Sequence, residues 1–140
     1  IGAVDELVKN YNCPVYLSKD DEILANDPEL NKIYERSSKI SSPIKNYPVG
    51  NLELGSFKFA VYDTPGHTAG SVCLEWKNYL FTGDTLFAGD VGRTDLYSGS
   101  ETALKSSLKV IAGLNPDLIV LPGHGESSTL EKELLINKYL

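Results

Sequence analysis

The chain has only two histidines, and both close the same tripeptide, Pro-Gly-His, as residues His67 and His124. A third polar residue in a similar position, Asp84, also follows a glycine. These three residues each come shortly after an apolar run: residues 57–62, 118–121 and 79–81. Glycine allows the backbone to turn tightly after each predicted strand. If the strands share one direction in a sheet, two imidazoles and a carboxylate converge, which predicts a metal site.

Each of these residues, taken alone, has a simpler interpretation. A histidine in a Pro-Gly turn is usually a solvated loop residue, and an aspartate at a strand end is usually a turn former or a helix cap. Because the same arrangement occurs three times in 140 residues, we favour the metal hypothesis. The pattern does not identify a catalytic acid, base or nucleophile.

Four segments of the chain resemble the metallo-β-lactamase superfamily, and most of all its glyoxalase II-like (hydroxyacylglutathione hydrolase-like) branch. They are Thr64–Ser71, Phe81–Phe87, Gly92–Asp95 and Leu121–Gly125. The resemblance implies an α/β fold, part of an αββα sandwich with metals at one edge of its sheets. It also implies that His67 binds the first of two divalent ions, that Asp84 bridges both, and that His124 binds the second. Zinc is the first expectation for these ions, with iron and manganese as alternatives.

One ligand motif of the family, HxHxDH, does not occur in this chain, which begins at Ile1 and contains no methionine. In relatives the motif precedes a helix like the one expected here over residues 2–11. We therefore expect residues 1–140 to be the C-terminal portion of a single metallo-β-lactamase-like domain, truncated at its N-terminus. We also expect no appreciable hydrolase activity from this portion alone, because a dinuclear cluster needs more than three ligands.

The segment Gly92-Arg93-Thr94-Asp95 follows the Asp84 strand and contains two charged residues. The simplest interpretation is a surface ion pair between Arg93 and a neighbouring aspartate. In relatives this loop lies beside the metal site, so the resemblance suggests that Arg93 and Asp95 orient the metal ligands without binding the metal themselves.

Charge and composition narrow the class of partner. The formal net charge of −6 argues against nucleic acid and anionic membranes as partners. No apolar run approaches the roughly 20 residues of a membrane helix. The two cysteines, Cys13 and Cys73, stand in apolar, strand-like surroundings. We expect both to be buried free thiols in a protein of the reducing cytoplasm.

Apolar spacing and turn residues predict the elements that position these side chains. The predicted helices cover residues 2–11, 19–25, 28–36, 101–112 and 129–139, the last with Ser128 or Thr129 as its cap. The predicted strands cover residues 14–17, 52–54, 57–62, 71–76, 79–82 and 117–121, with hairpin turns at 55–56 and 77–78. Residues 37–48 are predicted to be loop. This order is typical of a layered α/β domain.

Three functions follow from these observations. The first is a hydrolase in which metals activate water for attack on a small-molecule thioester, by resemblance a glutathione thioester cleaved to a hydroxy acid and glutathione. The second is a persulfide dioxygenase of the same superfamily, with one iron and with His124 off the metal. The third is a non-catalytic half-domain whose sheet serves as an interaction surface.

We predict that the chain forms a homodimer or a larger homo-oligomer. In the parent fold two sheets pack face to face, and this chain carries most of only one. Burial is worth about 25 cal/mol per Å² of apolar surface, so an uncovered sheet face favours association with a second copy. Sedimentation at micromolar concentration measures the state, and a well-folded strict monomer that binds no hydrophobic dye contradicts the prediction. The strand residues expected on that face are Phe57, Phe59, Val61, Val72, Leu74, Leu80 and Leu121.

Overall fold

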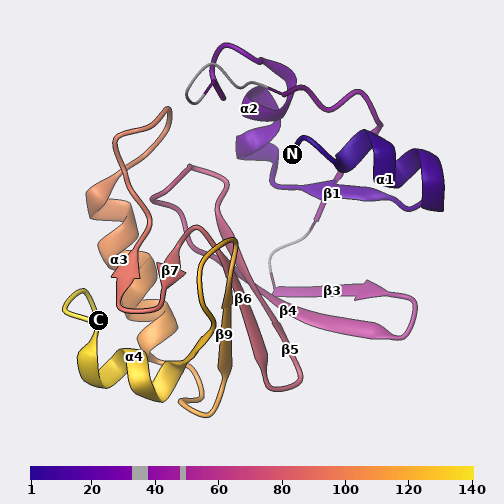
Figure 1. Ribbon diagram of the computed structural model, residues 1–140. Coiled ribbons are helices and arrows are strands. Elements are labelled where there is room, and N and C mark those ends of the chain that lie inside the picture. Colours follow the sequence, from indigo (N-terminus) through magenta and orange to yellow (C-terminus); the bar gives the residue numbers. More distant parts are fainter. Residues whose placement is uncertain (33–37, 48–49) are drawn as a thin grey trace. The chain divides into compact units, whose positions relative to one another are not determined.

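The computed structural model describes residues 1–32, 38–47 and 50–140, and the chain divides into two compact units, residues 1–47 and 48–140 (Figure 1). In the first unit β1 and β2 pair in parallel. The Ser18 hydroxyl accepts a hydrogen bond from the Asp20 amide and so caps the 3₁₀ turn that leads into α2. The elements of this unit are α1 (Val4–Tyr11), β1 (Val15–Leu17), the 3₁₀ turn (Lys19–Asp21), α2 (Glu22–Asn26) and β2 (Ile44–Asn46).

The helix predicted over residues 28–36 is wrong for the residues that the structure describes. Residues 28–31 form turns, and residues 33–36 of the prediction lie outside the described residues. The Asp27 carboxylate accepts from the Glu29 amide at 2.9 Å, which closes a local turn. The Asn31 amide then donates to the carbonyls of Leu24 and Ser38, both at 2.6 Å. These side-chain bonds to the backbone replace the helical hydrogen bonds.

Two further expectations for the first unit are wrong. Residues 37–48 are not all loop, because β2 lies among the described residues of this segment and pairs with β1. No alternating pattern marks this strand, and only its tertiary pairing defines it. Cys13 is exposed rather than buried, since it lies between α1 and β1 instead of inside a strand.

The second unit is built on a six-stranded sheet in the order β10-β9-β6-β5-β4-β3 (Figure 1). All its neighbouring strands are antiparallel except β6 and β9, which are parallel. The strands of this unit are β3 (Gly50–Leu54), β4 (Phe57–Asp63), β5 (Val72–Trp76), β6 (Tyr79–Gly83), β7 (Leu86–Phe87), β8 (Asp90–Val91), β9 (Ile119–Pro122) and β10 (Ser128–Thr129). The mixed α/β class is confirmed, whereas the short strands β7, β8 and β10 have no sequence pattern that predicts them.

The two predicted hairpins are confirmed by the strand pairing. Gly55, in the turn between β3 and β4, has φ of +59°, a conformation that glycine adopts without strain. Lys77, in the turn between β5 and β6, has φ of +57° although it carries a side chain. The Lys77 ammonium lies 4.4 Å from the centroid of the Trp76 ring, a cation–π contact.

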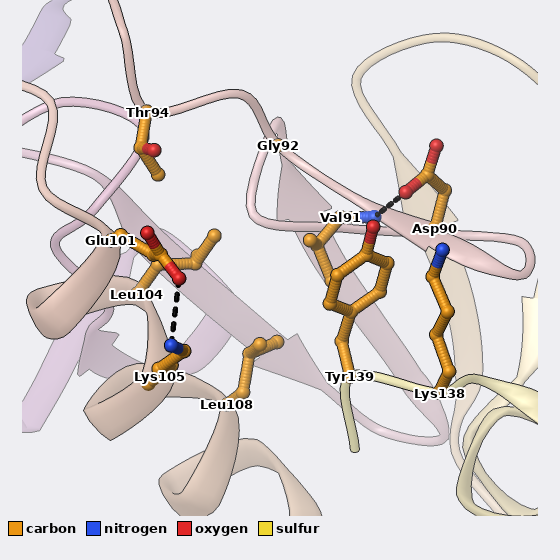
Figure 2. Close-up of a pocket in the computed structure, with 10 residues that line it drawn as sticks. All are labelled: Asp90, Val91, Gly92, Thr94, Glu101, Leu104, Lys105, Leu108, Lys138 and Tyr139. Carbon is orange, nitrogen blue, oxygen red and sulfur yellow. Dashed lines mark hydrogen bonds and ion pairs between the residues drawn. The ribbon is translucent and has the colours of Figure 1, made fainter.

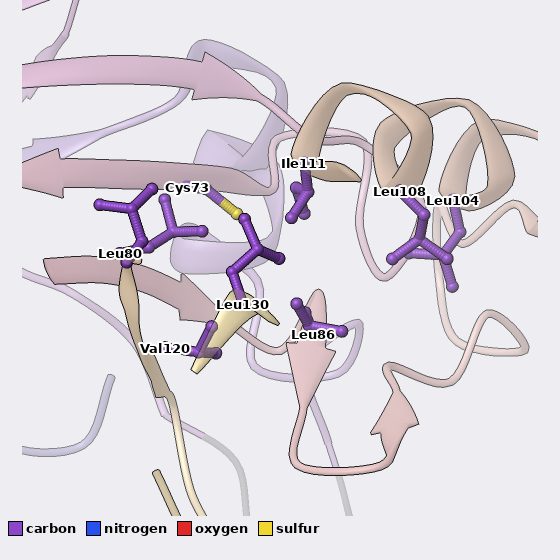
Figure 3. Packing of buried hydrophobic residues seen from close by; sticks show 9 residues of the cluster. Cys73, Leu80, Leu86, Leu104, Leu108, Ile111, Val120 and Leu130 are labelled. Atoms are coloured by element: carbon purple, nitrogen blue, oxygen red, sulfur yellow. The ribbon is translucent and has the colours of Figure 1, made fainter. Parts of the chain in front are cut away.

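Two helices, α3 (Glu101–Ala112) and α4 (Leu130–Ile136), contribute to the hydrophobic core of the second unit. The Ser100 hydroxyl accepts from the Ala103 amide at 3.2 Å, as the predicted cap requires. Thr129 rather than Ser128 caps α4, which ends at Ile136, earlier than predicted. The core residues, most of them labelled in Figure 3, are Cys73, Leu80, Leu86, Leu104, Leu108, Ile111, Leu118, Val120 and Leu130.

The expected uncovered face of the sheet can be checked against the exposure of its side chains. Val61 is only 2% exposed, so it is not uncovered as expected. Leu80 is fully buried in the core with α3 and α4, so it is not uncovered either. Its neighbour Phe81 points to the opposite face because side chains alternate along a strand, and it is 38% exposed. Phe57 on β4 is 46% exposed. In the part of the chain that the structure describes, no helix has the length and apolar content to cross a membrane.

We predict that Ile111→Ala lowers the free energy of unfolding by about 2–5 kcal/mol, because it leaves a cavity in a core that excludes solvent completely at this residue. Val110→Ala is the matched control, since Val110 is the preceding residue of α3 and is 48% exposed. Its effect should stay within about 0.5 kcal/mol. Urea denaturation of the three proteins measures both values, and equal stability of the two variants would show that α3 does not pack as described.

Candidate metal centre

Three strands of the six-stranded sheet end at one edge. β6 and β9 are parallel, and β4 runs in the same direction because β5 lies antiparallel between β4 and β6. The three predicted ligands, His67, Asp84 and His124, follow the ends of β4, β6 and β9. Sheet topology therefore delivers three residues that are distant in the sequence to the same edge.

At this edge both histidines face the same carboxylate oxygen. Nε2 of His67 lies 3.6 Å from Oδ2 of Asp84, and Nε2 of His124 also lies 3.6 Å from that atom. The exposed fractions of the side chains are 18% for His67, 35% for Asp84 and 71% for His124. The group is therefore anchored on the His67 side and open to solvent on the His124 side.

The second ring nitrogen of His67 defines which tautomer the ring adopts. Nδ1 of His67 lies 2.9 Å from the main-chain carbonyl oxygen of Arg93. Because a carbonyl oxygen only accepts hydrogen bonds, Nδ1 carries the proton and donates it. In the neutral imidazole Nε2 then presents its lone pair toward Asp84, as a metal ligand must.

The loop that carries His67 is fixed against α3. The Ser107 hydroxyl donates to the carbonyl of Pro65 at 2.7 Å, and the Ser100 amide donates to the carbonyl of Gly66 at 2.8 Å. Gly66 has φ of +148°, and a Cβ atom there would lie 2.5 Å from Leu104. Only glycine fits this contact, so Gly66 is required by the packing of the loop on the helix.

Two more glycines make room for Asp84. A Cβ atom on Gly123 would lie 2.5 Å from Oδ1 of Asp84, and the Gly123 amide donates to the carbonyl of Gly83 at 2.8 Å. A side chain on Gly92 would collide with the main-chain oxygen of Asp84. The residue before His124 is therefore glycine because the Asp84 carboxylate occupies the space of a side chain.

His124 is placed by an aromatic contact. The ring of Phe87, on β7, lies 4.5 Å from the His124 ring between centroids, at an interplanar angle of 32°. β7 begins two residues after Asp84, and the Thr82 hydroxyl donates to the carbonyl of Leu86 at 2.7 Å. The strand that precedes Asp84 and the hairpin that follows it therefore hold the ring that packs on His124.

The donor set suits zinc or iron, because imidazole nitrogen and carboxylate oxygen are ligands of both metals. Two donors about 2.0 Å from one tetrahedral ion lie roughly 3.3 Å apart, a little less than the observed 3.6 Å. Within residues 1–32, 38–47 and 50–140, no three His, Cys, Asp or Glu side chains are grouped so that they could hold a metal ion as they stand. His67, Asp84 and His124 would therefore have to move inward to bind one ion.

Arg93 and Asp95 form an ion pair in which both oxygens of the carboxylate are engaged. Nε and a terminal nitrogen of Arg93 lie 2.6 and 2.7 Å from the two Asp95 oxygens. The guanidinium hydrogen bond, more than the charge of Arg93, lowers the pKa of Asp95 from 3.8 to about 2. Arg93 contacts His67 through its main-chain oxygen, whereas Asp95 contacts Arg93.

Sequence reasoning did not identify the Arg93 carbonyl, Phe87 or the spatial roles of Gly92 and Gly123. A main-chain acceptor has no side-chain signature, and an aromatic residue after a strand is more often part of a core. The only signal available in the sequence was the glycine before each predicted ligand.

A separate pocket of about 490 Å³ lies in the second unit, and none of the three predicted ligands lines it (Figure 2). Two of its lining residues, Lys105 and Glu101, form an ion pair at 2.7 Å one turn apart on α3, with both side chains largely exposed to solvent. The lining residues are Asp90, Val91, Gly92, Thr94, Glu101, Leu104, Lys105, Leu108, Lys138 and Tyr139. Gly92, which lines this pocket, is also the residue at which a side chain would collide with the main-chain oxygen of Asp84.

The chain belongs to the metallo-beta-lactamase superfamily, whose family model matches residues 1–124. It is 33% identical to the probable metallo-hydrolase YqgX of Bacillus subtilis, over 100% of this chain and 70% of that protein. Over 64% of this chain and 43% of the relative, it is 39% identical to the hydroxyacylglutathione hydrolase GloC of Haemophilus influenzae.

Solved structures give the same assignment of fold. The BLEG-1 B3 metallo-beta-lactamase has a TM-score of 0.94 and 35% identity, over 99% of this chain and 70% of that one. TTHA1623 in a di-iron-bound form has a TM-score of 0.87 and 35% identity, over 100% of this chain and 71% of that one. The chain spans about two thirds of the length of the curated relatives it matches.

We predict that Arg93→Gln raises the pKa of Asp95 from about 2 toward 3.8. Because pairing lowers this pKa, the stabilisation it brings is complete above the unfolded value and is lost as the pH falls toward the folded value. A carboxyl ¹³C titration by NMR measures the shift. Lys105→Gln is the matched control, since Lys105 pairs with Glu101 and should leave the Asp95 pKa unchanged. An unchanged Asp95 pKa in Arg93→Gln would contradict the ion pair.

Proposed function

We propose that this chain is part of a metal-dependent hydrolase that cleaves a glutathione thioester into a hydroxy acid and glutathione. The observation that carries the proposal is the shared oxygen: both His67 and His124 direct Nε2 at the same Oδ2 of Asp84 from 3.6 Å. The similarity to the hydroxyacylglutathione hydrolase GloC supports the choice of substrate. The structure of TTHA1623 in a di-iron-bound form supports a centre of two metals.

In this proposal His67 would hold one divalent ion, His124 would hold the other, and Asp84 would serve both. When bound, such ions lower the pKa of a water molecule and polarise the carbonyl of the thioester. We take zinc as the first expectation, with iron or manganese as alternatives, since imidazole and carboxylate serve all three. The whole protein is the object of the proposal, because the chain spans about two thirds of the length of the curated relatives it matches.

The residues of this chain contribute orientation. The Arg93 carbonyl keeps the proton on Nδ1 of His67, so Nε2 is available as a ligand without rotation of the ring. The glycine at position 123 leaves space for the Asp84 carboxylate. The exposed His124 side leaves that side open for a substrate to approach, whereas the His67 side is closed by the loop against α3. Arg93 and Asp95 fix the loop behind His67 through their ion pair.

The alternatives remain distinct in what they require. A persulfide dioxygenase with one iron leaves His124 off the metal, yet His124 lies as close to Asp84 as His67 does. This equality favours the hydrolase. A non-catalytic interaction module requires none of the three side chains to converge.

We place the protein in the cytoplasm, where unpaired cysteines such as Cys13 and Cys73 remain reduced.

We predict that in the full-length protein Asp84→Ala removes both metals. We also expect it to lower the rate of thioester hydrolysis by more than the roughly 100-fold that is typical when a residue that only orients a metal ligand is removed. The physical reason is that Asp84 is the one side chain that both histidines face. Elemental analysis and hydrolysis of a hydroxyacylglutathione measure the two effects. Asp117→Ala serves as control, because Asp117 is exposed and precedes β9, at the edge of the sheet opposite the site.

Metal content and activity measurements on the variant and on the unaltered protein separate the three candidate functions. Retention of both metals and of near-normal activity in Asp84→Ala would show that the ligand assignment is wrong. Oxygen uptake with glutathione persulfide, in place of thioester hydrolysis by the unaltered protein, would identify the dioxygenase. An unaltered full-length protein that contains no metal and turns over neither substrate would leave the interaction module as the function.

A further inference from the structure

Glu133 is a charged side chain buried completely in the second unit, with an exposed fraction of 0%. Such burial is costly unless hydrogen bonds replace the lost water. Both oxygens of the carboxylate accept hydrogen bonds. The Ser128 hydroxyl donates to Oε1 at 2.5 Å. The Gly89 amide and the Asn137 side chain donate to Oε2 at 2.7 and 3.0 Å, respectively. Burial by itself raises the pKa of Glu133, but the hydrogen bonds together lower it, so the group is ionised.

These hydrogen bonds join three separate segments of the chain. Ser128 lies on β10, Asn137 follows the end of α4, and Gly89 lies in the turn between β7 and β8. Asn137 also donates to the carbonyl of Asp90 at 3.2 Å and is itself only 5% exposed. Glu133 and Asn137 therefore hold two consecutive residues of the hairpin, Gly89 in its turn and Asp90 at the start of β8.

The hairpin fixed in this way extends to the candidate metal centre at both of its ends. Its first strand, β7, carries Phe87, whose ring packs on His124. Its second strand, β8, leads through Gly92 to the Arg93 carbonyl that bonds Nδ1 of His67. The Gly92 amide donates to the carbonyl of Thr85 at 3.2 Å and closes the base of the hairpin. One hairpin thus contacts both histidines, and its turn is held by Glu133 and Asn137.

We propose that Glu133 is a positioning residue for the candidate metal centre: with Asn137 it fixes the turn between β7 and β8 and thereby the orientation of His67 and His124. The effect on metal affinity rests on the proposed function, whereas the effect on the histidine rings does not.

The test uses the 140-residue chain with ¹⁵N-labelled histidine and the variant Glu133→Gln. This change keeps the size of the side chain, leaves one acceptor oxygen in place of two, and removes the negative charge that strengthens the hydrogen bonds from Gly89 and Asn137. We expect the His124 ring protons to lose the shift caused by the Phe87 ring, and the His67 nitrogens to show a mixture of tautomers. Glu131→Gln is the matched control, because Glu131 lies on the same helix and is exposed; its histidine signals should not move.

Two further variants separate positioning from a general loss of stability. Asn137→Ala removes a donor to Glu133 together with the bond to Asp90, so it should move the histidine signals in the same direction. Ser128→Ala removes the hydrogen bond on the side away from the hairpin and should move them far less. Unchanged signals in Glu133→Gln and Asn137→Ala, or an equal change in Ser128→Ala, would overturn the proposal.

Zinc titration of the full-length protein gives the second measurement. We expect Glu133→Gln to weaken zinc binding by about 10- to 100-fold, as removal of partners behind metal ligands typically does. Zinc affinity equal to that of the unaltered protein would overturn the proposed link to the metal. If the unaltered full-length protein binds no divalent metal, the proposed function fails, and the histidine signals still decide whether Glu133 positions the two rings.

Discussion

The parallel pairing of β6 with β9 is the constraint on which the candidate site depends. It is the one parallel pair in the six-stranded sheet, and it ends where the Gly123 amide bonds the Gly83 carbonyl at 2.8 Å. Asp84 and His124 therefore leave neighbouring strands side by side. The hairpin β5–β6 then brings the end of β4, and with it His67, to the same edge. A change in the register of β6 and β9 would separate the carboxylate from His124.

The candidate site also requires that the backbone at two glycines, Gly66 and Gly123, come close to other parts of the fold. The Asp84 carboxylate stands where a side chain on residue 123 would be, and the His67 loop lies against α3 where residue 66 has no side chain. Each Pro-Gly-His tripeptide is therefore explained by contacts of its glycine with distant parts of the fold. A glycine in a loop often serves only its own turn, whereas these two serve the packing of another element.

The two histidines differ in how they are held. His67 is mostly buried, and a main-chain carbonyl determines its tautomer. His124 is largely exposed and is held by the face of Phe87. The hairpin of β7 and β8 is common to both contacts, and the buried pair of Glu133 and Asn137 secures that hairpin from the far side. The orientation of a solvent-facing site is thus maintained from the interior of the unit.

The sequence by itself determined the elements whose signals are local. The hairpin turns, the capped helix α3 and the three polar residues after strands depend on neighbouring residues, and the metallo-β-lactamase resemblance follows from contiguous motifs. The tertiary structure alone decided what depends on distant partners. The segment of β2 has no strand pattern and exists through pairing with β1. Residues 28–31 form turns because Asn31 bonds Leu24 and Ser38. The role of Glu133 likewise arises from hydrogen bonds to segments that only the folded chain brings together.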